Sequence, residues 1–312
     1  MCQVSVVVLT YNPDGEKLRQ TLRGVLAQTG VALELILCDD GSARKDFSFL
    51  PEFLGDRLPW KLIENPENRG TVYNCYSGIE AARGEYVFLT SPGDILFDSD
   101  TLHRFYTFAK AQNAPLCFGN AVRYGVSEGK PYRTAPYSIP PCPEVYKGSL
   151  RQQKISFFGD NLIIGACYFR SRELALRLLQ PFLGLCKYME DTPTTMLALL
   201  EGIPLAYLDS NIIFYEDGTG VSTGGNTKWK KLLHADLSAA LRLLREKFPK
   251  DACLQIACGN ALCENRIRRI ASRFLRHPIY SLAMLREKKL RRPKTVPCSR
   301  ADMERLQKLL EL

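Results

Sequence analysis

The sequence predicts an α/β fold with a doubly wound, mostly parallel sheet and a helical, basic C-terminal region. Between residues 4 and 94, short apolar runs alternate with segments of helical periodicity, and each apolar run ends in a polar cluster. The charge changes further along the chain: residues 1 to 225 hold 21 Lys+Arg and 25 Asp+Glu, whereas residues 226 to 312 hold 21 and 8. We therefore expect two regions, with a boundary near residue 225.

The first region is predicted element by element. Residues 4 to 9, 33 to 39, 60 to 63 and 86 to 89 are short apolar runs typical of buried strands. The stretches 18 to 26, 47 to 54 and 71 to 82 have the apolar spacing of helices. Open α/β sheets bind ligands beyond the carboxyl ends of their parallel strands. The polar clusters that follow these runs therefore predict a binding site at that edge.

The rest of the chain has a weaker pattern. Residues 116 to 168 contain short extended runs and proline-rich loops, which we expect to shape a binding pocket. Helices are predicted at about 171 to 180 and 192 to 201, and extended pieces at 204 to 208 and 212 to 215. Residues 216 to 223 hold two acids and a glycine-rich turn, and are expected either to close over a bound ligand as a loop or to form an ordinary connector. Residues 227 to 312 are expected to be helical almost throughout.

The composition argues against a zinc enzyme. The chain has three histidines and eleven cysteines, but no two cysteines have C-x2-C spacing. Cys253, Cys258 and Cys263 recur every five residues, a step that scatters side chains around a helix. We expect reduced, core-filling thiols in a cytoplasmic protein. The N-terminus lacks the basic segment of a signal peptide, and no run approaches the roughly 18 apolar residues of a transmembrane helix.

Five short motifs occur in one order: LTYN at 9 to 12, CDDGS at 38 to 42, ENPENRGT at 64 to 71, GEYVFL at 84 to 89 and YMEDTP at 188 to 193. In this order and spacing they resemble the family 2 glycosyltransferases with the GT-A fold, over roughly residues 3 to 220. The resemblance implies an inverting transferase of the hexosyl or hexosaminyl type in cell-surface polysaccharide or glycolipid synthesis. It would move a sugar from a nucleoside diphosphate donor, usually a UDP-sugar, to an acceptor hydroxyl. Residues 1 to 115 would then bind the nucleotide and residues 116 to 225 the acceptor.

The resemblance also implies a nucleotide site made of these motifs. Thr10 and Asp40 would contact the base, with Asp39 in support. Carboxylates suit a nucleoside, because the uracil imide N–H and the ribose hydroxyls are hydrogen-bond donors. Asn68 and Arg69, near a helix start, would place N–H groups and a guanidinium against the diphosphate or the base. Tyr11 and Asn12 of the first motif, and Ser91 just after the fourth apolar run, complete the expected set.

The segment after the fourth apolar run departs from the family pattern. The family usually has Asp-x-Asp-Asp here, with two carboxylates that hold the metal ion bridging the diphosphate. This chain has Ser91 and Gly93 at those two places, and only Asp94 remains. Three outcomes are open. Asp94 alone recruits Mn²⁺ or Mg²⁺ together with phosphate oxygens and water, or Arg and Lys side chains stabilise the leaving group, or the protein is a nucleotide-sugar-binding module without catalysis.

Glu190 and Asp191 are the expected catalytic pair. Family resemblance assigns the general base to Asp191, which would deprotonate the acceptor hydroxyl as it attacks the anomeric carbon. The run Asp191-Thr192-Pro193 is also typical of a helix start, with Asp191 as the N-cap and proline in the first turn. The two roles are compatible, because a cap would hold the carboxylate at a rigid helix entrance.

The basic C-terminal region predicts an anionic partner. Residues 277 to 294 set an apolar patch against a cationic flank, which suits an amphipathic element on an anionic membrane. We expect peripheral contact with the inner face of the cell membrane, beside a lipid-linked saccharide or other glycan acceptor. A solvated helical face, or support for the first region, is the alternative. Nucleic acid is not expected, because no recognition motif is present. A sugar-phosphate nucleotidyltransferase is disfavoured, since LTYNPDG lacks the cations that hold a triphosphate.

Overall fold

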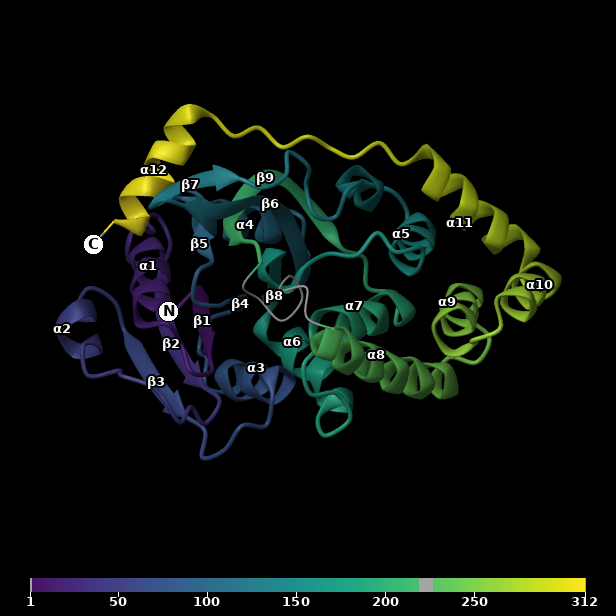
Figure 1. The fold of residues 1–312 in the computed structure, drawn as a ribbon, viewed down its shortest axis with the longest axis horizontal. Helices are drawn as coiled ribbons and strands as arrows, with labels where there is room; N and C mark the ends of the chain where they lie inside the picture. The colour runs from purple at the N-terminus through teal and green to yellow at the C-terminus, as the bar shows by residue number, and fades with distance from the viewer. Residues whose placement is uncertain (1, 219–226, 312) are drawn as a thin grey trace.

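The computed structural model describes residues 2–218 and 227–311, which form a mixed α/β fold around one sheet (Figure 1). Within these residues the sheet has nine strands, in the order β3-β2-β1-β4-β8-β6-β9-β5, with β7 paired to β6. Helix α3 packs on β1 and β2 with α6 beside it, and α4 packs on β6 and β9. The predicted α/β fold class is therefore confirmed.

The first four strands of the path are parallel, as predicted. They are β1 (Val4–Thr10), β2 (Leu33–Asp39), β3 (Trp60–Glu64) and β4 (Tyr86–Thr90). They alternate with α1 (Gly15–Leu26), α2 (Leu50–Leu54) and α3 (Thr71–Glu80). In the register, Thr10 lies opposite Asp39, and Asp39 opposite Glu64. The polar motifs after these strands therefore meet at one edge.

The second half of the sheet is mixed. Strand β8 (Tyr168–Ser171) is antiparallel to both β4 and β6 (Leu116–Ser127), while β9 (Ala206–Glu216) is parallel to β6. The short strand β5 (Ile95–Leu96) pairs antiparallel with β9, and β7 (Lys130–Arg133) with β6. Four further helices belong to this half: α4 (Thr101–Ala111), α5 (Leu150–Phe158), α6 (Arg172–Leu179) and α7 (Asp191–Leu200).

The region from 116 to 168 is more regular than expected. It contains the twelve-residue strand β6 and the helix α5, where the sequence predicted only short extended runs and loops. Helix α5 buries polar and apolar residues alike, including Gln153, Ser156 and Phe157, so it has no amphipathic stripe to reveal it. The two extended pieces predicted within 204 to 215 are one strand, β9, whose pairing with β6 shifts register around Asn120.

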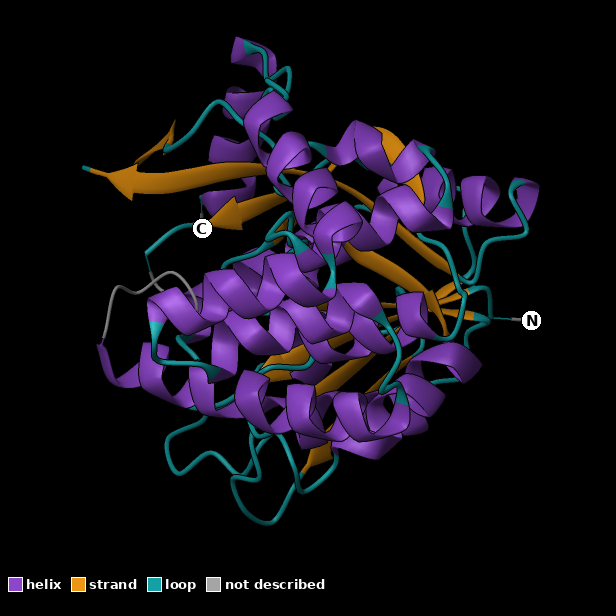
Figure 2. Cartoon of the chain, turned by 90° about the vertical axis from the view of Figure 1, so that its right-hand side faces the viewer, coloured by secondary structure: helices purple, strands orange, loops and turns teal. Residues whose placement is uncertain are grey.

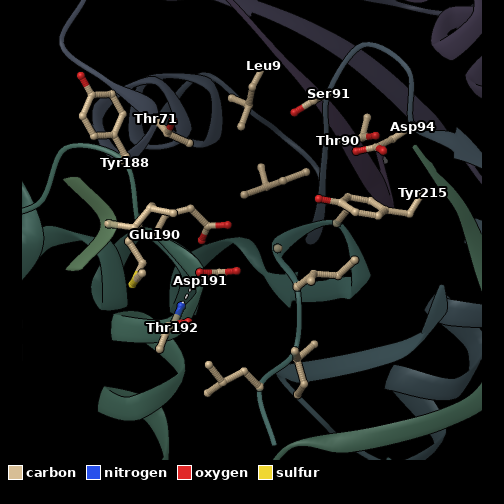
Figure 3. A pocket seen from close by; sticks show the side chains of 18 of the residues that line it. Leu9, Thr71, Thr90, Ser91, Asp94, Tyr188, Glu190, Asp191, Thr192 and Tyr215 are labelled. Atoms are coloured by element: carbon tan, nitrogen blue, oxygen red, sulfur yellow. Dashed lines mark hydrogen bonds between the residues drawn. The ribbon is translucent and has the colours of Figure 1, made fainter. Parts of the chain in front are cut away.

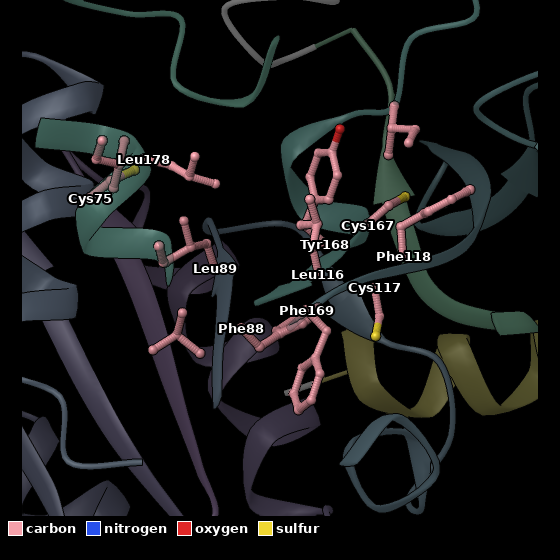
Figure 4. Packing of buried hydrophobic residues seen from close by; sticks show 14 of the residues in the cluster. Cys75, Phe88, Leu89, Leu116, Cys117, Phe118, Cys167, Tyr168, Phe169 and Leu178 are labelled. Carbon is pink, nitrogen blue, oxygen red and sulfur yellow. The ribbon is translucent and has the colours of Figure 1, made fainter. Parts of the chain in front are cut away.

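Aromatic and cysteine side chains fill the centre of the core, where the two halves of the sheet meet (Figure 4). Phe169 on β8 stacks on Tyr86 and on Phe105, with ring centroids 4.8 and 4.9 Å apart. Cys117 and Cys167 are fully buried among them. All eleven cysteines are free and most are buried, which confirms the expectation of core-filling thiols.

The C-terminal region packs along the outside of the first region. It contains α8 (Thr227–Lys247), α9 (Ala252–Leu262), α10 (Arg266–Arg276), α11 (Pro278–Leu290) and α12 (Arg300–Leu310). Helix α8 packs on α7. Helices α9 and α11 both pack on α5, and α12 contacts α1 and β7 (Figure 1). Leu306 of α12 and Val296 complete a second apolar cluster with Phe97, Tyr124 and Phe214.

Two expectations for this region meet the structure differently. The stretch between α11 and α12 is extended rather than helical, because Pro293 and Pro297 cannot continue a helix, and Thr295 bridges to Tyr137. The predicted boundary near 225, and most of the predicted loop at 216 to 223, lie outside the described residues. Among the helices that are described, none combines the length and apolar character needed to cross a bilayer.

Candidate active site

Asp39, at the end of β2, is directed into the protein. Its carboxylate is fully buried and accepts hydrogen bonds from the Thr10 hydroxyl and the Ser42 backbone N–H, each 2.9 Å long. The Lys45 ammonium lies 3.3 Å away and also pairs with Glu64. Asp39 therefore joins the ends of β1 and β2 to the loop that follows, and its ligand contact stays a prediction.

Asp40 holds the loop that leads into α3. Its two carboxylate oxygens accept from the backbone N–H groups of Arg69 and Gly70, at 2.9 and 2.8 Å. Gly70 has φ +92, and a Cβ built there would collide with Lys187. The NRG segment thus needs its glycine both for the turn and for close contact with the loop before α7. Asp40 brings two of the predicted motifs together by positioning backbone.

Two planar side chains remain exposed beside these buried carboxylates. Tyr11 is 54% exposed, although its neighbour Asn12 is held by its N–H, which donates to the Ser42 hydroxyl at 2.6 Å. The Arg69 guanidinium lies over the Tyr73 ring, 3.3 Å from its centroid. Because the backbone around them is fixed, Tyr11 and Arg69 can offer flat surfaces to a ligand without reordering the loops.

A cavity of about 410 Å³ lies between the end of β4 and the start of α7 (Figure 3). Four of the predicted site residues line it: Ser91, Asp94, Glu190 and Asp191. In Figure 3 the carboxylates of Glu190 and Asp191 point across the cavity toward Thr90, Ser91 and Asp94. The predicted residues at the ends of β1 and β2, together with Asn68 and Arg69, are not among its lining residues. The structure therefore divides the predicted site into a cavity and an adjoining strand-end surface.

The turn after β4 is fixed by neighbouring elements. The Thr21 hydroxyl of α1 donates to the Asp94 carbonyl at 2.9 Å and accepts from the Gly93 N–H at 3.0 Å. The Tyr124 hydroxyl donates to the Gly93 carbonyl at 2.5 Å. Ser91 is exposed at the cavity. The turn therefore has a defined shape although it lacks the family's two carboxylates.

A carboxylate from another strand lies beside Gly93. A Cβ built on Gly93 would collide with Glu216 Oε2, so the Glu216 side chain, from the end of β9, fills the space next to this position. Glu216 pairs with Lys17 at 2.7 Å, and its N–H donates to Asp94 Oδ1 at 3.3 Å. Burial, with a smaller contribution from the Glu216 charge, raises the pKa of Asp94 to about 8. Sequence reasoning placed Glu216 in a loop and missed this approach.

These two carboxylates fit a divalent cation. Asp94 and Glu216 both line the cavity, and a hard cation accepts one or two protein carboxylates when phosphate oxygens and water supply the rest. The described residues contain no group of three or more His, Cys, Asp or Glu side chains placed for a metal ion. A site here would thus depend on ligand oxygens as well as on protein.

Helix α7 begins one residue earlier than expected, so that Asp191 is its first residue and not its N-cap. Glu190 is the N-cap residue, without a side-chain cap, so the prediction that Asp191 caps the helix is wrong. Asp191 Oδ1 instead accepts the Thr192 N–H at 2.6 Å, which leaves the carboxylate facing the cavity. Burial, followed by the Glu190 charge, raises the pKa of Asp191 from 3.8 to about 6. The group is ionised at neutral pH and is a stronger base than an ordinary aspartate.

Glu190 belongs to a buried ion pair that sequence reasoning did not find. Its Oε2 lies 2.9 Å from the Arg170 guanidinium of β8, and both side chains are almost fully buried. The Arg170 guanidinium also lies over the Tyr168 ring, 4.4 Å from its centroid. Nothing in the short segment YFRS marks its arginine as buried, because the partner is 20 residues away.

Asp236 on α8 holds the loop that precedes Glu190 and Asp191. One of its oxygens, Oδ2, accepts three consecutive backbone N–H groups, of Lys187, Tyr188 and Met189, at 3.0, 2.6 and 3.0 Å. Asp236 is buried in the interface between α8 and this loop. The C-terminal region therefore positions the cavity wall, a contact that no local pattern in the sequence signals.

The sequence model of the family described as Glycosyl transferase family 2 matches residues 5–177, more than half of the chain. This chain belongs to glycosyltransferase family 2. The matched segment includes the parallel strands, the Asp39–Asp40 motif and the turn at Ser91 and Asp94, which agrees with the resemblance seen in the sequence.

Two curated relatives share parts of this family 2 chain. Glycosyltransferase GlyG of Streptococcus pneumoniae serotype 4 is 28% identical over 129 residues, which cover 41% of this chain and 42% of the relative. The glucosyl-dolichyl phosphate glucuronosyltransferase of Haloferax volcanii is 38% identical over 86 residues, 27% of each chain. The chain thus spans less than half the length of these relatives.

Solved structures support the GT-A fold over nearly the whole family 2 chain. Residues 1–349 of Staphylococcus aureus TarS, in complex with UDP-GlcNAc, align with a TM-score of 0.56 at 16% identity, covering 99% of this chain and 90% of that one. The mannosyltransferase PcManGT from Pyrobaculum calidifontis, in complex with GDP-Man and Mn²⁺, aligns with a TM-score of 0.54 at 16% identity, covering 92% and 87%. At this identity the likeness concerns the fold.

Proposed function

We propose that this protein is an inverting glycosyltransferase that moves a hexosyl or hexosaminyl group from a UDP-sugar to an acceptor hydroxyl, with Asp191 as the general base. One observation carries the proposal. A carboxylate with its pKa raised to about 6 faces a cavity whose opposite wall is the strand-end turn of a family 2 fold. A base of this strength is ionised at neutral pH and accepts a proton more readily than an exposed aspartate.

The proposed reaction is a single displacement. Asp191 accepts the proton of the acceptor hydroxyl as the acceptor oxygen forms a bond to the anomeric carbon. The bond from that carbon to the diphosphate oxygen breaks, and the diphosphate leaves with the electron pair. Attack from the face opposite the leaving group inverts the anomeric configuration. Glu190, held by Arg170 at 2.9 Å, lies beside the base, and its negative charge contributes to the raised pKa of Asp191.

The nucleotide would lie on the strand-end surface formed by Thr10, Tyr11, Asn12, Asn68 and Arg69. Its base would stack on the exposed Tyr11 ring, since every nucleobase has a flat face that can stack on an aromatic ring. The Arg69 guanidinium would pair with the diphosphate. The strand-end carboxylates, Asp39 and Asp40, would act mainly through the loops that they hold. TarS and PcManGT were solved with UDP-GlcNAc and GDP-Man, which supports a nucleotide-sugar as the donor.

A divalent cation, Mn²⁺ or Mg²⁺, would be held by Asp94 and Glu216. Such an ion neutralises charge on the diphosphate when it is bound. Lys17, which pairs with Glu216 at 2.7 Å, would then be free to meet a phosphate oxygen. Ser91, exposed at the same turn, would donate its hydroxyl to the donor. The Glu216 carboxylate would thus take the place of the family carboxylate that is missing at Gly93.

The acceptor would enter along the apolar wall of the cavity. This wall is formed by residues 162 to 164 and by Leu233 of α8, opposite the polar turn. We propose a saccharide of a cell-surface polysaccharide or glycolipid as the acceptor, because sugar rings present apolar faces as well as hydroxyls. The C-terminal region therefore contributes to the acceptor side of the site.

Nucleotide binding is tested by thermal unfolding with UDP, TDP, GDP and CDP, each with and without Mn²⁺. We expect UDP to raise the melting temperature most, since a ligand of the folded state stabilises it by mass action. Tyr11→Ser should weaken UDP binding by roughly tenfold or more, because stacking on one base contributes about 1–3 kcal/mol. Tyr132→Ser, which changes a similarly exposed tyrosine on β7, is the control. No shift with any nucleotide would refute the proposed function.

The role of Glu216 is tested by calorimetric titration of UDP with and without Mn²⁺. Wild type should bind UDP more tightly with Mn²⁺, and Glu216→Gln should lose most of that difference because one cation ligand is neutralised. Asp217→Asn is the matched control, since the Asp217 carboxylate pairs with Arg123 and Asp217 does not line the cavity. If wild-type UDP affinity is indifferent to Mn²⁺, the cation assignment is wrong and Lys17 is left as the candidate for leaving-group stabilisation.

A further inference from the structure

Helix α10 has an apolar stripe that faces solvent. At 100° per residue, Ile267, Ile270, Phe274 and Leu275 fall on one side of the helix. The side chains of Ile267 and Leu275 are 80% and 82% exposed, and Ile270 is 46% exposed. No residue of this helix is buried. Surface helices normally turn such a stripe toward the core, so α10 presents the reverse arrangement.

Two arginines on the other side of α10, Arg269 and Arg273, are half-buried and lie toward the protein, whereas Arg266, Arg268 and Arg276 are exposed. The Arg269 guanidinium donates to the Asn260 carbonyl of α9 at 3.2 Å. The Arg273 carbonyl accepts from the Ser281 hydroxyl of α11 at 2.9 Å. These contacts fix the rotation of α10 about its axis. The outward position of the apolar stripe is therefore set by the fold.

Helix α11 extends the exposed apolar surface beyond the turn at His277. Ile279 and Leu282 are 68% and 59% exposed, whereas Ser281 and Met284 of the same helix are buried. Further along, Arg291 pairs with Glu287 at 2.8 Å, and Glu287 in turn accepts from Ser156 of α5. Both helices form the right-hand margin of Figure 1, the side that faces the viewer in Figure 2.

The segment that contains these two helices and the residues next to them carries a strong positive charge. Residues 264 to 292 contain ten Lys+Arg and two Glu, a net charge of 10 − 2 = +8. Seven of the cations are exposed: Arg266, Arg268, Arg276, Arg286, Lys288, Lys289 and Arg292. Aliphatic side chains flanked by exposed cations match the headgroup region of an anionic bilayer.

Other occupants match this surface less well. A second copy of the chain would bring two patches of +8 together, which opposes self-association through this face. A nucleic acid would find cations, but the most exposed side chains between them are Ile and Leu rather than aromatic stacking groups. An anionic lipid surface matches both the positive charge and the exposed apolar side chains of α10 and α11.

We propose that α10 and α11 form a docking surface for an anionic lipid bilayer. Ile267, Leu275 and Ile279 enter the headgroup region, and the exposed cations of the two helices contact lipid phosphates. The protein lies on the membrane without crossing it. The proposal does not rest on the proposed function, because lipid binding is measured without donor or acceptor.

The proposal is tested by co-sedimentation with vesicles of phosphatidylcholine alone and of phosphatidylcholine mixed with phosphatidylglycerol. Wild type should bind the mixed vesicles, release at high salt, and ignore the neutral ones. The double variant Ile267→Ser/Leu275→Ser should lose at least roughly tenfold in partition, because these side chains supply the apolar contact. Its melting temperature should stay unchanged, since both side chains are at least 80% exposed.

A matched control separates this surface from exposed apolar residues in general. The double variant Val126→Ser/Leu185→Ser changes two half-exposed side chains on β6 and before α7, and should bind like wild type. Soluble glycerol phosphate should not compete, because it offers the charge without the bilayer. Equal binding by the Ile267→Ser/Leu275→Ser variant, or binding to neutral vesicles, would overturn the proposal. So would a wild-type dimer that this variant converts to a monomer.

Discussion

Replacement of Asp191 by asparagine is expected to lower the rate of sugar transfer by about 10²- to 10⁴-fold, the range typical for loss of a general base. Asparagine keeps the oxygen that accepts the Thr192 N–H at 2.6 Å, so the start of α7 should be retained. Nucleotide affinity should also be retained, because the strand-end surface is untouched. Transfer is measured as acceptor-dependent UDP release, and binding by calorimetric titration of UDP.

The control for this variant is Asp100→Asn. Asp100 is the N-cap residue of α4 and does not line the cavity, so its replacement should leave transfer unchanged. If Asp191→Asn transfers sugar at the wild-type rate, Asp191 is not the base. If wild type binds UDP but neither transfers sugar nor hydrolyses the donor, the protein is a nucleotide-sugar-binding module on the same fold.

The pH dependence of the wild type follows from the same carboxylate. Because the pKa of Asp191 is raised to about 6, kcat/KM should fall as the pH drops through about 6 rather than near 4. The folded state also binds the Asp191 proton more tightly than the unfolded state does. This carboxylate therefore destabilises the fold above pH 6, and Asp191→Asn should raise the free energy of unfolding there but not below about pH 4.

Replacement of Arg170 by methionine is expected to lower the free energy of unfolding by about 3–5 kcal/mol, because it leaves the buried Glu190 carboxylate without its partner. The Arg170 charge lowers the pKa of Asp191. Its loss should therefore raise that pKa and move the acid limb of kcat/KM to higher pH. Stability is measured by urea denaturation, and the pH profile by UDP release. A merely structural role for Arg170 would leave the profile unmoved.

Arg177→Met provides the comparison for a surface ion pair. Arg177 pairs with Glu201, but its side chain is half exposed, so the variant should lose less than about 1 kcal/mol. The double variant Arg170→Met/Glu190→Gln should recover part of the lost stability, since no unpaired charge remains buried. A loss below about 1 kcal/mol for Arg170→Met would show that Glu190 finds another partner or becomes neutral.

Local sequence patterns determined much of this protein. The apolar runs predicted the four parallel strands, and three of them, β1, β2 and β4, are mostly apolar because they are covered on both faces. The polar clusters after β1 to β4 predicted the edge of the candidate site, since each follows the carboxyl end of a parallel strand. Asp191 was located by its motif at the start of α7. Each of these features depends on residues close together in the chain.

Tertiary structure alone decided the partners of those motifs. Gly93 reads as a lost carboxylate until β9 brings Glu216 beside it, 123 residues later. Arg170 and Asp236 read as ordinary surface residues until folding buries them against Glu190 and the loop of residues 187 to 189. Helical periodicity puts the apolar residues of α10 on one side of the helix, but only packing decides that this side faces outward. Sequence spacing fixes which side chains share a face, whereas the surroundings of that face depend on contacts between distant segments.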